Sequence, residues 1–198
     1  MKYLLGALMG ISLLSGVAPS KNAAPETEPP STPPAPLIAP SYTVSMTAYN
    51  AVPAQTDSSP FETASGAYSN PQVVAARSQD LGSDLPFGTI IAVTDAPTNG
   101  GACGYSVVKP IIGYRVIADT MNVKFTNRID ILFPTSANYL LSSGTEKNAS
   151  LVLGVCHNVS IRVVGHIDLS NPANLPKTQA ALASIVRYGT STPTLAAR

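Results

Sequence analysis

From Tyr42 onward, apolar and polar residues alternate in short runs, and residues that favour turns separate one run from the next. A period of two places alternate side chains on opposite faces, which is typical of a β-strand that is buried on one face. Many short strands at close spacing, with little helical pattern between them, favour a small closed barrel. We therefore predict a mainly β fold, with strands over 42–49, 72–76, 89–94, 114–119, 128–133, 151–156 and 159–167.

One or two short helices are expected beside these strands. The first spans 136–141, where Ser136 can act as the N-cap. The second spans 178–188, and Gly189 can end it. The second helix belongs to a C-terminal tail that we place at 171–198, after a barrel domain at 42–170.

The N-terminal residues resemble an export signal followed by a spacer. Lys2 precedes an apolar run at 3–17, and Ala18 and Ser20 are small residues at a typical cleavage spacing, which predicts a signal peptide over 1–20. The run is shorter than the roughly 20 apolar residues that span a bilayer, although an uncleaved anchor stays an alternative. Residues 21–41 are rich in proline and predict a semi-stiff linker. We expect an exported protein of the periplasm, cell envelope or extracellular space, without a transmembrane span once mature.

The charge balance argues against a nucleic-acid partner. The chain carries 12 Lys and Arg against 11 Asp and Glu, and its formal net charge is +1. Binding to phosphates requires a clustered basic surface, which this composition does not indicate. No pattern in the sequence indicates an oligomeric state.

The two cysteines, Cys103 and Cys156, are predicted to form a disulfide, because thiols in exported proteins tend to be oxidised. A catalytic thiol at Cys156 with His157 as its base is the weaker alternative, since neighbours on a strand point to opposite faces. His157 and His166 have no third ligand at a recognisable spacing, so we expect neither a metal nor another cofactor.

Two carboxylates, Asp119 and Asp130, stand out because they lie in strongly apolar strands. In the second strand Ile129 and Ile131 share one face, and Arg128 and Asp130 share the other. If the isoleucines fill the barrel, Asp130 faces outward or into a groove. Partial desolvation there would raise the pKa of Asp130, as a general acid requires, whereas the cation of Arg128 would lower it.

An ordered series of short motifs extends over residues 47–164 and resembles the 3D (three-aspartate) domain. This domain is a six-stranded double-psi β-barrel module of bacterial wall enzymes, among them the lytic transglycosylase A group, and its barrel is similar to rare lipoprotein A and to expansins. Eleven positions separate the last two aspartates. The motifs are Thr47-Ala48-Tyr49-Asn50, Gln55-Thr56-Asp57, Thr63-Ala64-Ser65-Gly66, Val73-Val74-Ala75-Ala76, Leu85-Pro86-Phe87-Gly88-Thr89, Ala118-Asp119-Thr120 and Asn127-Arg128-Ile129-Asp130-Ile131.

The resemblance implies a lytic transglycosylase acting on peptidoglycan. Such an enzyme cleaves the β-1,4 bond between N-acetylmuramic acid and N-acetylglucosamine and leaves a 1,6-anhydro end. Asp130 matches the acid/base of the family, and Asp119 would hold or polarise it. The family's first aspartate has no direct counterpart, and Asp80 is the nearest substitute. A second departure is the segment 121–126, which replaces a glycine-rich turn.

The resemblance also suggests which residues bind substrate: Tyr49, Asn50, Thr63, Ser65, Gly66 and Arg128. For Tyr49 a place in the barrel core is an equal alternative to stacking on a sugar ring, and for 63–66 turn formation is the alternative to glycan binding. The alternative at the level of function is a peptidoglycan-binding or expansin-like wall-remodelling module without catalysis.

Overall fold

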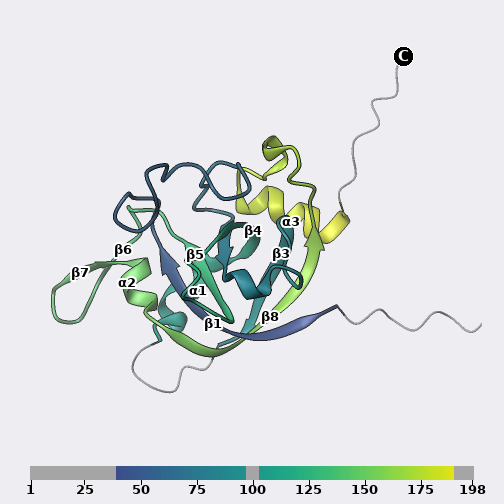
Figure 1. Ribbon diagram of the computed structural model, residues 1–198. Helices are drawn as coiled ribbons and strands as arrows, with labels where there is room; N and C mark the ends of the chain where they lie inside the picture. Colours follow the sequence, from purple (N-terminus) through teal and green to yellow (C-terminus); the bar gives the residue numbers. More distant parts are fainter. Residues whose placement is uncertain (1–38, 97–102, 190–198) are drawn as a thin grey trace, which may run out of the picture. The chain divides into compact units, whose positions relative to one another are not determined.

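A computed structural model describes residues 39–96 and 103–189 of the chain. The predicted signal peptide, most of the predicted linker and the last nine residues lie outside this range. The fold is mainly β, and its centre is a closed barrel of six strands (Figure 1). In order around the barrel these are β1 (Ser41–Tyr49), β5 (Arg128–Leu132), β2 (Val74–Arg77), β4 (Tyr114–Thr120), β3 (Thr89–Asp95) and β8 (Cys156–His166).

The barrel mixes both strand directions. The pairs β1–β5 and β2–β4 are parallel, and the other four neighbouring pairs are antiparallel. Parallel neighbours need crossover connections, and the long segment between β1 and β2 crosses one end of the barrel (Figure 1). A closed, mixed, six-stranded barrel is compatible with the double-psi barrel that the sequence suggests.

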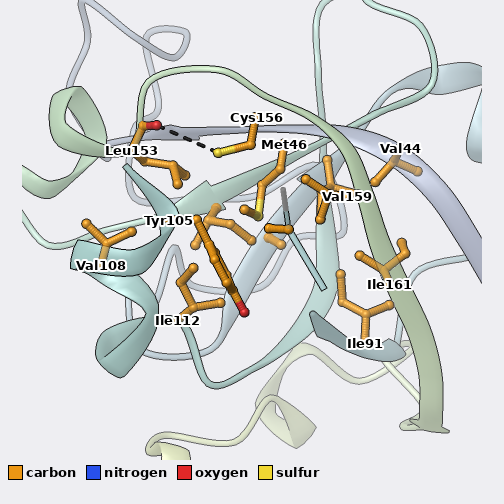
Figure 2. Packing of buried hydrophobic residues seen from close by; sticks show 14 of the residues in the cluster. Val44, Met46, Ile91, Tyr105, Val108, Ile112, Leu153, Cys156, Val159 and Ile161 are labelled. Atoms are coloured by element: carbon orange, nitrogen blue, oxygen red, sulfur yellow. Dashed lines mark hydrogen bonds between the residues drawn. The ribbon is translucent and has the colours of Figure 1, made fainter. Parts of the chain in front are cut away.

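The barrel interior is filled by the apolar faces of the strands. Met46, Ile91, Ile129, Ile131 and Ile161 are fully buried in one cluster. Figure 2 shows how helix α1 (Tyr105–Ile112) covers one side of this cluster with Tyr105, Val108 and Ile112. Because Ile129 and Ile131 point inward, their neighbours Arg128 and Asp130 on β5 are left on the outer face, as the alternation predicts.

A second apolar layer lies on the outside of β2, β3 and β4. Val74, Ala76, Ile90 and Val116 pack there with Leu182 of helix α3 (Gln179–Tyr188) and with residues of the chain that leads to it. Strands that are covered on both faces are apolar at nearly every position, which is why 72–76 and 114–118 do not alternate. The predicted helix over 178–188 is confirmed: the Thr178 side chain caps it by accepting from the Ala181 N–H, and Gly189 follows it with φ +75°.

Two predicted elements are wrong. The helix expected over 136–141 is instead strand β6 (Asn138–Leu140), which pairs with β7 (Glu146–Asn148) in a small hairpin. The strand expected over 151–156 is helix α2 (Ala149–Leu153). The side chain of Asn148 accepts from the Ser150 N–H and begins this helix, and Gly154, with φ +63°, allows it to end. β8 therefore begins only at Cys156.

Helix α1 was not predicted, and it brings the α-helices within the described part of the chain to three, where one or two were expected. Pro110 lies inside it, and a proline there removes a backbone donor. The side chain of the fully buried Arg115 satisfies carbonyl groups in the last turn of α1, because it donates to those of Ile111 (2.8 Å) and Ile112 (2.6 Å). Burial lowers the pKa of Arg115 to about 9, so it still carries its charge at neutral pH.

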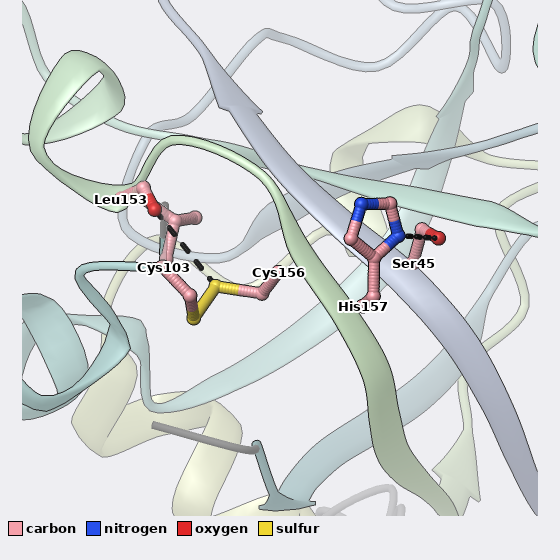
Figure 3. Close-up of a disulfide and its surroundings, with 5 residues drawn as sticks. All are labelled: Ser45, Cys103, Leu153, Cys156 and His157. Carbon is pink, nitrogen blue, oxygen red and sulfur yellow. Dashed lines mark hydrogen bonds between the residues drawn. A yellow bond between two sulfur atoms is a disulfide. The ribbon is translucent and has the colours of Figure 1, made fainter. Parts of the chain in front are cut away.

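The predicted disulfide between Cys103 and Cys156 is present and joins residues 53 positions apart in the sequence (Figure 3). It connects the segment before α1 to the start of β8. His157 leaves the opposite side of β8, and its Nδ1 lies 3.2 Å from Oγ of Ser45. Cys156 is therefore not a free nucleophile, and His157 does not face it. Among the helices of residues 39–96 and 103–189, none has both the length and the apolar character needed to cross a membrane.

Candidate active site

An open cleft of about 830 Å³ lies where β1, β4 and β5 bring polar side chains together. Asp119 is the penultimate residue of β4, Asp130 lies in the middle of β5, and Tyr49 ends β1. One wall is the segment that follows β1, and the other is the segment that joins β4 to β5. The lining residues of the two walls include Gln55, Thr56, Asp57, Ser59, Glu62, Thr63, Ala64, Met121, Asn122, Lys124 and Phe125.

Asp130 is the carboxyl group best suited to proton transfer in this cleft. Its side chain is half-buried, and its Oδ1 accepts a hydrogen bond of 2.8 Å from Oγ1 of Thr47 on the neighbouring parallel strand. Desolvation raises the pKa of Asp130 to about 6, against the smaller lowering effects of Thr47 and Arg128. Nearby Asp119 adds to the increase. A carboxyl group with a pKa near 6 can both give and take a proton near neutral pH.

Asp119 is held by three donors. Its Oδ2 accepts from the Tyr49 hydroxyl at 2.9 Å, and its Oδ1 accepts from the backbone N–H groups of Ala64 and Thr120, each at 2.9 Å. These bonds tie β1, the wall at 63–67 and β4 together at the cleft. Asp119 is therefore held in position beside Asp130. Through its bond to the Ala64 N–H, it also holds the cleft wall at 63–67.

Tyr49 belongs to both the core and the cleft. It is 7% exposed, and its ring packs in the second apolar layer, outside the barrel interior, while its hydroxyl reaches Asp119. Burial and the charge of Asp119 raise the pKa of Tyr49 well above its ordinary value, so the phenol stays a proton donor. Its ring presents no open face on which a sugar could stack.

The residues at 63–66 form a tight turn at the edge of the cleft. Thr63 lines the cleft, although it is only 4% exposed, and its hydroxyl lies 3.0 Å from that of Ser65 and donates to the Ala67 carbonyl. Gly66 takes φ +78° at the tip, a conformation that favours glycine. Ser65 and Gly66 do not line the cleft, so turn formation accounts for most of this motif.

Asn50 lies away from the cleft. It is buried, and its amide nitrogen donates to the Phe133 carbonyl (2.9 Å) and to Oδ1 of Asn148 (3.1 Å), while its Oδ1 accepts from the Ser150 hydroxyl (2.9 Å). All of its side-chain polar atoms are engaged within the protein. Asn50 connects the end of β1 to the start of α2, and its backbone N–H donates to Oε1 of the cleft residue Gln55 (2.7 Å).

Asp80 and Arg128 also lie outside the cleft lining. Asp80 is exposed, and its Oδ2 accepts from the Asn127 N–H at 2.8 Å, which fixes the chain just before β5. Hydrogen bonds from Ser78 and from Asn127 lower the pKa of Asp80, so it remains an anion. The Arg128 guanidinium lies over the Phe125 ring, 4.9 Å from its centre, and makes no ion pair with Asp130 within 4 Å.

Two functional features were not found in the sequence. The first is Thr47, which belongs to one of the motifs and donates directly to Asp130. The strand period of two could have indicated this role, because it places Thr47 on the same strand face as Tyr49. The second is the aromatic and cationic wall at Lys124 and Phe125, where the Lys124 ammonium lies 5.0 Å from the centre of the Phe125 ring.

Across the described ranges, no three His, Cys, Asp or Glu side chains gather in a way that could hold a metal ion. Comparison of the chain with models of protein families, with curated proteins and with solved structures found no match.

Proposed function

We propose that this protein is an exported enzyme that cleaves peptidoglycan by lytic transglycosylation, with Asp130 as its general acid and base. The single observation that carries the proposal is the half-buried Asp130, which faces an open cleft, has a pKa raised to about 6 and is not neutralised by an ion pair with Arg128. The resemblance of the motif series to the three-aspartate domain supplies the substrate and the reaction type.

The reaction needs one carboxyl group that acts twice. The protonated carboxyl of Asp130 gives its proton to the oxygen of the glycosidic bond as the bond from that oxygen to C1 of the muramoyl unit breaks. The C6 hydroxyl of the same unit then forms a bond to C1 and gives its proton to the Asp130 carboxylate. The acid is restored, and the products are a 1,6-anhydromuramoyl end and a free 4-hydroxyl. No water is consumed, unlike hydrolysis by two carboxylates.

The arrangement around Asp130 supports this cycle. Thr47 donates to Oδ1, so the proton of the neutral acid resides on Oδ2, and that oxygen is left for the substrate. The charge of Asp119 beside Asp130 favours the protonated form and would stabilise positive charge that develops at C1. Hydroxyl and amide side chains of the walls, such as Gln55, Thr56 and Asn122, are suitable partners for sugar hydroxyls.

Export is part of the proposal. A disulfide such as Cys103–Cys156 persists in oxidising compartments and is rare in the cytosol. The predicted signal peptide and linker would deliver the barrel to the envelope. Mass spectrometry of the mature N-terminus tests this, and a cleaved product that begins near residue 21 is the expected result.

The test of the activity compares wild type with Asp130→Asn on purified sacculi. We expect wild type to release soluble fragments that end in 1,6-anhydromuramic acid. Asp130→Asn should release none while its binding to sacculi is unchanged, because asparagine keeps the shape but cannot transfer a proton. Fragments with reducing ends from both proteins would refute the proposal. Binding by wild type without any release would support the alternative, a glycan-binding module, for which the open polar cleft is also suited.

A further inference from the structure

A second hollow, of about 450 Å³, lies beside the cleft and has a different character. It is mainly apolar and is formed where the segment after the cleft wall meets the 3₁₀ turn Pro172–Asn174 and the chain that follows it. Its lining residues are Tyr68, Asn70, Pro172, Ala173, Leu175 and Lys177.

One small hairpin, residues 61–69, contributes to the lining of both the cleft and this hollow. The Ser69 N–H donates to the Phe61 carbonyl, the Thr63 N–H donates to the Ala67 carbonyl, and Glu62 pairs with Tyr68 across the hairpin. Glu62 lines the cleft, whereas Tyr68 lines the hollow. Directly paired residues in such a ladder lie about 5 Å apart, so an extended ligand that leaves the cleft past Glu62 arrives at Tyr68.

The hollow is fixed in shape by bonds that do not involve a ligand. The Asn70 amide donates to the carbonyls of Pro176 (3.2 Å) and Lys177 (3.0 Å), and its Oδ1 accepts from the Gln72 N–H (3.0 Å). Leu175 is buried beneath it. The Tyr68 ring, by contrast, is 62% exposed over this fixed floor, and a large exposed aromatic ring beside an apolar hollow is typical of a binding site.

The charge of the hollow is opposite to that of the cleft. The cleft is lined by Asp57, Glu62, Asp119 and Asp130 against Lys124, whereas the charged residue of the hollow is Lys177. Lys177 is exposed, and none of the described carboxylates lies within 4 Å of its ammonium group. A ligand that extends over both the cleft and the hollow would place its neutral part in the cleft and its acidic group at Lys177. This charge pairing would fix the position of the ligand along the two sites.

We propose that this hollow is an additional saccharide subsite that holds a sugar unit with a carboxylate-bearing substituent, from the strand that occupies the cleft. The sugar ring lies on Tyr68, and the carboxylate pairs with Lys177. This inference rests on the proposed function for the identity of the strand. Muramoyl units carry such a carboxylate, either on the free lactyl group or on an attached peptide.

The test measures binding of defined oligosaccharides to Asp130→Asn, so that cleavage does not interfere. The probes are peptide-free muramoyl tetrasaccharides, the same tetrasaccharides with their peptides, and neutral chito-tetrasaccharides. We expect Tyr68→Ala to weaken binding of the muramoyl ligands by roughly three- to tenfold, the range for loss of one aromatic contact. Phe61→Ala is the matched control, because Phe61 is 63% exposed on the same hairpin but does not line the hollow.

The Lys177→Gln variant tests the acidic part of the inference. It should weaken binding of a carboxylate-bearing ligand several-fold at low salt and leave the neutral chito-tetrasaccharide unchanged. Whether the peptide-free or the peptide-bearing ligand is affected identifies the carboxylate as lactyl or peptide. Equal effects of Tyr68→Ala and Phe61→Ala, or an equal loss for neutral ligands in Lys177→Gln, would overturn the subsite. If the subsite is overturned but wild type still releases anhydro products, the proposed function stands. If the ligands bind at the subsite but wild type cleaves nothing, the subsite stands and the proposed catalytic activity is refuted.

Discussion

The hydroxyl of Thr47 donates a hydrogen bond of 2.8 Å to Oδ1 of Asp130, across a parallel strand pair whose members are 83 residues apart in the sequence. A donor of this kind favours the ionised form of a carboxyl group, and it opposes the desolvation that raises the pKa of Asp130 to about 6. Thr47 thus decides which oxygen carries the proton and moderates how tightly that proton is held.

Thr47→Val should raise the pKa of Asp130 further, by roughly one unit, because valine keeps the shape of threonine but removes the donor. A titration of the Asp130 carboxyl carbon by NMR measures this directly. In sacculus digestion the loss of activity at high pH should move upward by a similar amount. Thr47→Ser restores the hydroxyl and should restore both values. An unchanged titration in Thr47→Val would show that the hydrogen bond does not control the acid.

Asp130→Asn should change how stability depends on pH. The folded pKa of about 6 is above the ordinary 3.8, so between these values the folded state binds more protons than the unfolded state. The neutral carboxyl therefore contributes its full stability below about pH 4, and that contribution is lost as the pH rises through about 6. Asparagine stays neutral throughout, so the variant should be more stable than wild type at pH 7, by at most about 3 kcal/mol.

Urea unfolding at pH 4, 5, 6 and 7 measures this difference. It should be close to zero at pH 4 and grow with pH. Asp84→Asn is the control for removal of an aspartate outside the cleft, because Asp84 is exposed and does not line the cleft, so only a trend absent from this variant is assigned to Asp130. A constant difference between Asp130→Asn and wild type would contradict the raised pKa.

Tyr49→Phe should lower the free energy of unfolding by about 1.5–3 kcal/mol, the range for a hydrogen bond to a charged group. The phenol ring stays packed, but Oδ2 of Asp119 loses its donor. Since Asp119 also holds the Ala64 N–H, we expect faster hydrogen exchange at Ala64 and at the neighbouring Ser65. Tyr188→Phe, at a tyrosine that is 69% exposed, should leave both measurements unchanged.

The strands of the barrel could be predicted because their local pattern and their burial agree. Ile129 and Ile131 alternate with Arg128 and Asp130, and the structure buries the isoleucines and leaves the other two outside. Helix α2 could not be predicted in the same way, since its apolar residues 151–153 are equally typical of a strand. The two ends of the segment favour a helix, because Asn148 caps the first turn and Gly154 allows the last turn to end. These end signals are hard to recognise beside so short an apolar run.

The candidate site was predictable only in part, because its contacts are non-local. The sequence places Asp119 and Asp130 on apolar strands, but the bond from Tyr49 to Asp119 joins residues 70 apart. Whether Asn50 faces the cleft depends on Asn148 at the end of β7 and on Ser150 in α2, two elements that were not predicted. The candidate residues could therefore be recognised in the sequence. Which of them face the cleft and which support it depends on contacts that form only in the closed barrel.

Removal of the disulfide should destabilise the fold without changing the acid. In the chain-entropy account, opening a cross-link between residues 53 apart lowers the free energy of unfolding by about 4 kcal/mol. The Cys103→Ala/Cys156→Ala double variant should show this loss in urea, and dithiothreitol should shift wild type toward the variant while leaving the variant unchanged. Neither cysteine lines the cleft, so the NMR titration of Asp130 should stay near pH 6 in the folded variant. A shifted titration would mean that the cross-link also shapes the cleft, and wild type unaffected by dithiothreitol would mean that the bond contributes no stability.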